Sequence, residues 1–298
     1  MRTLAAITAC VVLGANAAFA HGAGADEPSM AWTFDPWIVL PLAVAGAAYA
    51  GGAVRLWHRA GFGRVRLWHG MAYAAGWLSL VAALVSPLHW LGERLFTAHM
   101  IEHEIVMAVA APLLVLARPL GPMLWALPLA ARRRIGRLVR QPWLQTVWRS
   151  LSSGRNATLL HGMAIWAWHA PALFDAAVTD VAMHRLQHLS FFLTGVLFWW
   201  SVIRRSDPGA AAWHLFVTML HTSALGALMA LAPRVLYGEQ TLHSAEWGLS
   251  PLADQQLAGV VMWVPAGTVY AGAALALTAL WIHQSGKSPV QTDARPTP

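Results

Sequence analysis

Two pairs of histidines with the spacing His-x-x-x-His are the residues of this sequence best suited to chemistry. His99 and His103 form the first pair, and His184 and His188 form the second. A spacing of four places both imidazoles on one face of a helix, one turn apart, which is a chelating geometry. Two such pairs could supply up to four nitrogen ligands to a metal ion. His169, within Trp-His-Ala-Pro, is a fifth candidate ligand.

The neighbours of these pairs bear on the choice of metal. The single cysteine, Cys10, falls in a segment expected to be removed, which excludes thiolate and iron–sulfur sites in the mature chain. Imidazole suits zinc, copper, iron and nickel, and the thioethers of Met100 and Met183 favour Cu(I), although methionine is also an ordinary packing residue. Glu102 could orient a ligand histidine or be a solvated or histidine-paired carboxylate. Copper, as Cu(I) or Cu(II), is the expected metal.

Heme b is the alternative cofactor, because histidine pairs in helical bundles also ligate heme. Axial ligands lie on opposite sides of the macrocycle, so one heme between two helices would leave two histidines unused. The motif Cys-x-x-Cys-His is absent, which excludes covalently attached heme. Gly-x-Ser-x-Gly, phosphate-loop and His-Glu-x-x-His motifs are absent too. No catalytic residue is predicted, and the chain is not expected to be an enzyme.

The composition indicates that these histidines lie in a membrane protein. Of the 298 residues, 57% are hydrophobic and 11% are charged, whereas soluble domains carry roughly a quarter charged residues. The composition excludes a soluble enzyme, a disordered chain and, despite a net charge of +7, a nucleic-acid partner. An ionisable residue inside a membrane span is costly and is a functional hypothesis by default.

Seven apolar stretches are long enough to cross a bilayer as helices, which takes about 20 residues each. Because the stretches are continuous rather than alternating, the predicted fold is all-α, a polytopic membrane bundle of seven transmembrane helices over residues 37–283. The spans are expected at 37–57, 69–88, 95–117, 156–176, 184–203, 212–232 and 257–283. Pro112 and Pro119 are expected to kink or end the third span.

The N-terminus is predicted to be a cleaved signal peptide, residues 1–20. Arg2 is followed by a short apolar run and by an Ala-x-Ala pattern that ends at Ala20. Cleavage would expose His21, whose free amine and ring nitrogen could chelate copper together. Residues 21–36 would then form a periplasmic segment.

The distribution of basic residues predicts the orientation. Sixteen of the twenty lysines and arginines fall in the loops of one side and in the C-terminal tail. That side is the cytoplasm by the positive-inside rule. The protein is therefore expected in the bacterial inner membrane, with a periplasmic N-terminus and a cytoplasmic tail, 284–298. The Arg-rich segment 120–150 is interrupted by prolines and is predicted to lie on the cytoplasmic face, held by anionic lipid.

Other polar residues are assigned by their positions in the predicted spans and loops. Asp254 and Gln255, at the outer start of the last span, could close over the histidine cavity and hydrogen-bond a ligand, or Asp254 could be a helix-start carboxylate. His221 is placed near the middle of the sixth span. His89 and His243 lie in outer loops, where they could pass metal inward, but they are expected to be solvated. Four histidines are expected at the cytoplasmic interface: His58, His69, His161 and His214.

Three blocks of the sequence carry a family resemblance. They are His99-Met100-Ile101-Glu102-His103 with Ala111-Pro112-Leu113-Leu114; Trp166-Ala167-Trp168-His169-Ala170-Pro171 continuing to His184-Arg185-Leu186-Gln187-His188 and Phe198-Trp199-Trp200; and 248–259 with Met262-Trp263. Together, over roughly residues 35–283, they resemble the CtaG-type assembly factors of caa-type cytochrome c oxidase, a seven-helix membrane family. The chain is not similar to the single-span, cysteine-bearing copper chaperone that shares this name.

The resemblance implies a role in maturing heme–copper oxidase, with oxidase subunits as partners and a periplasmic copper chaperone as a further candidate. The expected function is to bind copper in an outward-facing, histidine-rich membrane cavity and to deliver it to the oxidase. Three alternatives stay open: a b-heme electron-transfer protein, a copper or proton transporter with a path along His161, His169 and His221, and a scaffold that binds no metal.

Overall fold

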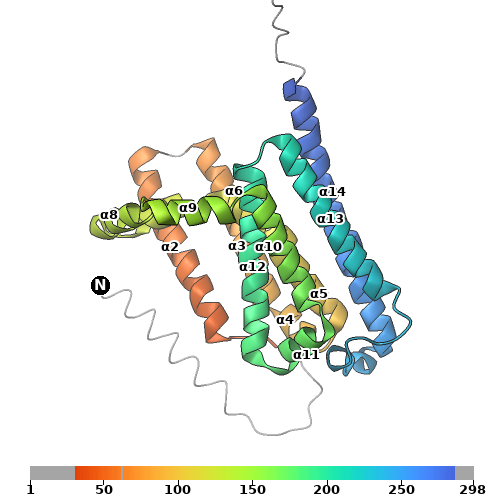
Figure 1. The fold of residues 1–298 in the computed structure, drawn as a ribbon. Helices are drawn as coiled ribbons and strands as arrows, with labels where there is room; N and C mark the ends of the chain where they lie inside the picture. Colours follow the sequence, from red (N-terminus) through yellow and green to blue (C-terminus); the bar gives the residue numbers. More distant parts are fainter. Residues whose placement is uncertain (1–30, 62, 286–298) are drawn as a thin grey trace, which may run out of the picture. The chain divides into compact units, whose positions relative to one another are not determined.

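The computed structural model describes residues 31–61 and 63–285, and every regular element within these ranges is a helix (Figure 1). The all-helical class expected from the sequence is therefore confirmed for the described residues. The predicted signal peptide, His21 and the predicted tail beyond residue 285 lie outside them.

Five helices in the described part of the chain are long and apolar enough to cross a membrane. They coincide with the first, second, third, fifth and seventh predicted spans, which supports a membrane protein. Four of them are α2 (Pro36–Ala60), α3 (Arg64–Leu84), α12 (Val181–Arg204) and α14 (Pro251–Ser285). The fifth is one continuous span made of α5 (Phe96–Glu104), η1 (Ile105–Ala110) and α6 (Ala111–Ala117).

The other two predicted spans take different forms. The stretch 156–176 is divided into α10 (Gly154–Trp168), only 15 residues long, and α11 (Pro171–Thr179). A proline disfavours helical backbone in the residue before it, and Ala170 is accordingly extended, with ψ 125°. α13 (Pro208–Ala230) has 23 residues but is not among the five candidate spans. Seven crossings stay a prediction.

The third span changes its helical geometry at Pro112. The turn before it, η1, is a π-helix, in which a backbone N–H bonds the carbonyl five residues back. Pro112 has no N–H, so the Met107 carbonyl lacks this partner. The indole N–H of Trp199 on α12 donates to that carbonyl instead, at 2.9 Å. The span ends before Arg118, which is left-handed at φ 51°, and Pro119. The end of the span at Pro119 is as expected, the helix continues through Pro112, and a kink at Pro112 stays a prediction.

Glycines permit the closest helix packing in the described bundle. α13 and α14 run side by side (Figure 1), and a Cβ on Gly226 would lie 2.8 Å from the carbonyl oxygen of Gly259. A Cβ on Gly52 of α2 would overlap the carbonyl of Pro122, so α7 (Leu120–Ala126) rests directly on the α2 backbone.

The Arg-rich segment consists of α7 and two further short helices that run across the long helices (Figure 1). These are α8 (Leu129–Leu138) and α9 (Pro142–Leu151). The segment was predicted to be interrupted by prolines, and two of them lie at helix boundaries: Pro128 directly precedes α8, and Pro142 begins α9. Pro122 lies within the first turn of α7 and does not interrupt it.

Short elements gather around the N-terminal ends of α5 and α14. They are α4 (Pro87–Gly92), η2 (Glu239–Thr241) and η3 (Ser244–Trp247). α4 packs on α5, η3 packs on α14, and η2 contacts both α11 and α14. These contacts enclose the end of the bundle that carries both histidine pairs.

Candidate metal centre

Three imidazoles converge between α5 and α12. One ring nitrogen from each of His99, His103 and His188 lies within 4.8 Å of the others. The three side chains are buried, at 2%, 1% and 8% relative exposure. The wall around them is aromatic, because Phe174 lies 5.4 Å from His99 and Phe191 lies 4.7 Å from His103, between ring centroids. The first predicted pair therefore meets one member of the second in a buried place with aromatic walls.

The nitrogens of this group lack hydrogen-bond partners among the described residues. Both ring nitrogens of His99, both of His103, and Nδ1 of His188 are buried and unpartnered. Buried polar groups are nearly always paired, and each that is not requires an explanation such as an ion or a water. Neutral imidazole nitrogens are good ligands for copper and zinc. The donor set thus suits a metal ion.

His169 adjoins this group with one nitrogen free. It follows α10, and its ring centroid lies 6.3 Å from that of His103. Its Nδ1 lies 2.7 Å from the carbonyl oxygen of Ile165. A carbonyl only accepts, so Nδ1 carries the proton and Nε2 is left with a lone pair. That Nε2 is buried and unpartnered. His169 is held in the tautomer that a fourth ligand requires, although it lies outside the group of three.

His184 contacts the group from its outer side. Its Nε2 lies 2.8 Å from Nε2 of His188, and its ring stacks 5.5 Å from that of His99. It is partly exposed, whereas the three converging histidines are buried. The two members of the second predicted pair therefore differ in position. His188 belongs to the central group, and His184 hydrogen-bonds to it from nearer the surface.

His89 is the residue that sequence reasoning missed. It was expected to be solvated, but it is 5% exposed, in α4. Its Nδ1 lies 3.1 Å from Oε1 of Glu102, whose other oxygen lies 3.9 Å from Nδ1 of His99. Burial lowers the pKa of His89. The start of this short helix could have been predicted from Ser86-Pro87, because serine is a common N-cap residue and proline a common first helical residue. In the structure the Ser86 hydroxyl caps the helix that begins at Pro87.

Glu102 links His89 to the central group. Its side chain is fully buried, and a Cβ on Gly92 would lie only 2.8 Å from its carboxyl carbon, so a glycine is needed beside it. Pairing with a histidine was one of the possibilities open from the sequence, but the carboxylate is buried instead of interfacial. A role in orienting a ligand histidine stays a prediction. Such a carboxylate can set the tautomer and orientation of a ligand histidine.

Asp254 acts on the helix that carries the first pair rather than on a histidine. Its carboxylate accepts hydrogen bonds from the backbone N–H groups of Phe96 and Thr97 and from the hydroxyls of Thr97 and Ser244, at 2.7–2.9 Å. Asp254 is therefore a carboxylate at a helix start, which was one of the two predictions. The helix that it caps is α5, however, and not its own helix, α14. Asp254 thus fixes the position of His99 and His103.

Gln255 holds the loop before η2. Its side-chain oxygen accepts hydrogen bonds from the N–H groups of Leu236 and Tyr237, at 2.6 and 3.3 Å. The Tyr237 hydroxyl in turn donates to the carbonyl of His169 at 2.7 Å. Burial raises the pKa of Tyr237 to about 12, so the hydroxyl remains a donor. Gln255 thus reaches His169 through Tyr237 and does not bond an imidazole itself.

The two methionines beside the pairs belong to the apolar core. Met100 is 1% exposed and lies in one cluster with Phe96 and Phe174, and Met183 packs against that cluster. Their packing role is therefore evident in the structure, and a ligand role stays a prediction.

A second set of histidines lies on α10 and α13. His161 was expected at the interface but is fully buried; its Nδ1 contacts the Thr194 hydroxyl at 3.1 Å, and its Nε2 is unpartnered. His221 accepts from the Trp166 indole at 3.3 Å. His214 lies 3.1 Å from the Thr158 hydroxyl. His243 is exposed, as expected, and pairs with Glu246 at 2.7 Å.

Similarity to known proteins was found at the level of a family. The profile of the family described as cytochrome c oxidase caa3 assembly factor (Caa3_CtaG) matches residues 47–284, which is more than half of the chain. This range contains all three converging histidines, together with His89, His169 and His184.

Curated relatives are uncharacterized mycobacterial proteins. One from Mycobacterium leprae is 29% identical over 278 residues, which cover 88% of this chain and 41% of the relative. One from Mycobacterium bovis and one from Mycobacterium tuberculosis are each 27% identical over 271 residues, 85% of this chain and 40% of the relative. The chain thus spans about two fifths of the length of these relatives. No solved structure matches it significantly.

Proposed function

Because this chain belongs to the family of cytochrome c oxidase caa3 assembly factors, we propose that it binds one copper ion at His99, His103 and His188 and delivers it to a heme–copper oxidase during assembly. The observation that carries this proposal is the convergence of three buried imidazoles whose nitrogens are within 4.8 Å of one another. Copper is cargo here, and the role requires binding and release without covalent catalysis.

The arrangement of the histidines supports a stepwise entry of the ion. His184 is partly exposed and hydrogen-bonded to buried His188, so an ion captured at His184 can exchange onto the deeper imidazoles. Neutral imidazoles exchange without leaving a bare charge in an apolar place. His169, with its free Nε2, is placed to take part on the far side of His103.

The proposed setting is the bacterial inner membrane, with the histidine end facing the periplasm and the C-terminus in the cytoplasm. The support is the concentration of arginines at the opposite ends of the spans. Partners in this setting are subunits of the oxidase and a periplasmic protein that donates copper.

A b-type heme fits this centre poorly. Two axial imidazoles must lie on opposite faces of the macrocycle, and the ring then extends sideways from the iron. The third imidazole, with a nitrogen within 4.8 Å of both others, occupies that space. The three-histidine geometry therefore favours a bare metal ion.

A copper transporter is a second candidate function, favoured by one observation. His161 is fully buried with Nε2 unpartnered, and it lies on α10, the helix that leads to His169. Transport would appear as copper uptake into proteoliposomes that is lost in the His221→Ala variant. Delivery alone predicts no uptake in the unmodified protein.

The deciding experiment measures metal content and the visible spectrum of the detergent-purified protein after Cu(I) loading. We expect about one copper per chain and no Soret band. The His99→Ala/His103→Ala/His188→Ala variant should lose the copper, whereas His243→Ala, an exposed histidine, should retain it. A Soret band lost in the triple variant would indicate heme. Absence of copper in the unmodified protein after loading would contradict the proposal and favour a scaffold.

A further inference from the structure

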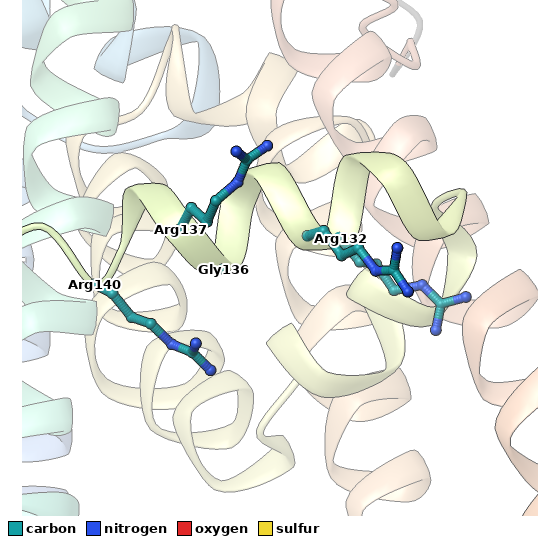
Figure 2. Close-up of a pocket in the computed structure, with 5 residues that line it drawn as sticks. Arg132, Gly136, Arg137 and Arg140 are labelled. Atoms are coloured by element: carbon teal, nitrogen blue, oxygen red, sulfur yellow. The ribbon is translucent and has the colours of Figure 1, made fainter.

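Two arginine-lined pockets adjoin at α8, one where it meets α2 and α7 and the other along α8 itself. The smaller, about 280 Å³, is lined by Arg55, His58, Arg59, Trp125 and Arg132. The larger, about 470 Å³, is lined by Arg132, Arg133, Gly136 and Arg137 of α8 and by Arg140, which follows this helix (Figure 2). Arg132 belongs to both, so the two pockets adjoin. Neither is lined by an acidic residue.

The smaller pocket is built from elements that the structure holds together. The Gly52 contact sets α7 on α2, and the guanidinium of Arg55 donates to the carbonyls of Trp125 and Ala126, at 3.3 and 2.6 Å. This fixes Trp125 beside the last two turns of α2. The arginines that line the pocket are therefore brought together by packing and not by chance surface exposure.

The cations in this place have no acidic partner among residues 31–61 and 63–285. The guanidinium carbons of Arg59 and Arg132 lie 5.5 and 4.6 Å from the centroid of the same Trp125 ring. Nε of Arg132 is buried and has no hydrogen-bond partner among the described residues. Like charges at this spacing repel one another, and guanidinium groups bind phosphate oxygens with charge-assisted, often bidentate, hydrogen bonds. The site is therefore suited to an anion.

Its position indicates the source of that anion. Arg55, His58 and Arg59 occupy the end of a helix long and apolar enough to cross a membrane, which places the pocket at the level of lipid headgroups. Leu138, Val139 and Trp143, between and on α8 and α9, are large, apolar and exposed, so acyl chains can lie against them.

We propose that the paired pockets bind the headgroup of an anionic phospholipid with two phosphates, one phosphate in each pocket and Arg132 between them. The ligand class is a diphosphatidyl lipid of the cardiolipin type. This site is distinct from the histidine centre and does not depend on the proposed copper role.

The test uses the full-length protein, delipidated in detergent and titrated with cardiolipin, phosphatidylglycerol or phosphatidylcholine, with bound lipid counted by native mass spectrometry. We expect one cardiolipin per chain, bound at least tenfold more tightly than phosphatidylglycerol at equal phosphate concentration, and no retained phosphatidylcholine. The Arg59→Gln/Arg132→Gln variant should weaken cardiolipin binding about tenfold or more, the loss expected for removed charge-assisted contacts.

Two further double variants serve as a charge-matched control and as an independent test of the second pocket. Arg134→Gln/Arg149→Gln removes the same charge from α8 and α9 but lines neither pocket, and it should bind cardiolipin within twofold of the unmodified protein. Arg137→Gln/Arg140→Gln changes exposed residues of the second pocket, so it will fold even if the first variant does not, and it should also weaken binding. Equal losses in all variants, equal affinity for phosphatidylglycerol, or displacement by millimolar inorganic phosphate would overturn the proposal.

Discussion

The carboxylate of Asp254 caps a helix that begins 158 residues earlier in the chain, accepting the backbone N–H of Phe96 at 2.8 Å and that of Thr97 at 2.9 Å. Leu95, at the N-cap position of α5, provides no side-chain acceptor of its own. The first turn of α5 holds His99, and the next holds His103. The last membrane helix therefore positions the first pair of candidate ligands.

Replacement of Asp254 by alanine is expected to destabilise the protein and loosen the metal centre. The buried donors of Phe96, Thr97 and Ser244 would lose their acceptor, which costs about 3 kcal/mol in total. The measurement is thermal unfolding in detergent together with copper affinity. Asp207→Ala removes the exposed local cap of α13 and should cost only about 1 kcal/mol, with copper affinity unchanged. Equal effects of the two changes would argue against the positioning role.

Copper affinity is expected to fall at acidic pH, because protons compete with the metal for imidazole nitrogens. Burial in an apolar place opposes protonation of an imidazole, so the fall is expected below the free-histidine value of about 6.5. The measurement is a competition titration with a Cu(I) chelator between pH 8 and pH 4, and a flat affinity over this whole range would contradict imidazole ligation.

The stability of the metal-free protein is expected to have its own dependence on pH, through His89. Burial lowers the pKa of His89 in the folded state, while in the unfolded chain it is about 6.5. Its contribution is therefore complete above about pH 6.5 and is lost as the pH falls through the folded-state value. The His89→Gln variant should have a melting temperature that changes less between pH 8 and pH 5. His243→Gln, at an exposed histidine, should behave like the unmodified protein.

The sequence was sufficient to predict the helical class, five of the candidate membrane helices and the meeting of the first histidine pair with one member of the second. Hydropathy and the His-x-x-x-His spacing can be recognised within short stretches of sequence. The alternating direction of successive spans then places both pairs at the same end of the bundle. His99, His103 and His188 meet as these rules require. The resemblance to the assembly-factor family rested on the same blocks and is confirmed.

The remaining features depend on contacts that a linear pattern does not contain. The partners of Asp254 are set by the packing of α14 on α5, and those of Gln255 by the loop that precedes η2. His161 was placed at an interface because span limits were drawn from hydropathy, whereas α10 begins at Gly154 and carries it two turns inward. His89 was missed because a helix of six residues has no readable periodicity.

Glu102→Gln is expected to weaken copper binding by about 10- to 100-fold, the usual effect of losing a carboxylate that orients a ligand histidine. The amide keeps the shape beside Gly92 but places a donor where His89 and His99 present ring nitrogens. Copper affinity and stoichiometry are the readouts. Glu104→Gln, on the same helix but without a hydrogen bond to any described histidine, is the control, and an equal loss there would contradict the role of Glu102.

His184 and His188 are expected to differ in their effect on copper, although they belong to one sequence pair. His188 is in the central group, so His188→Ala should remove a ligand and abolish stable binding. His184 contacts the group through Nε2 of His188 at 2.8 Å and is nearer the surface, so His184→Ala should retain one copper per chain while slowing its loading. Stopped-flow loading from a Cu(I)–chelator complex, followed by metal analysis, separates the two results. Loss of stoichiometric copper in His184→Ala would place His184 among the ligands and move the centre toward the surface.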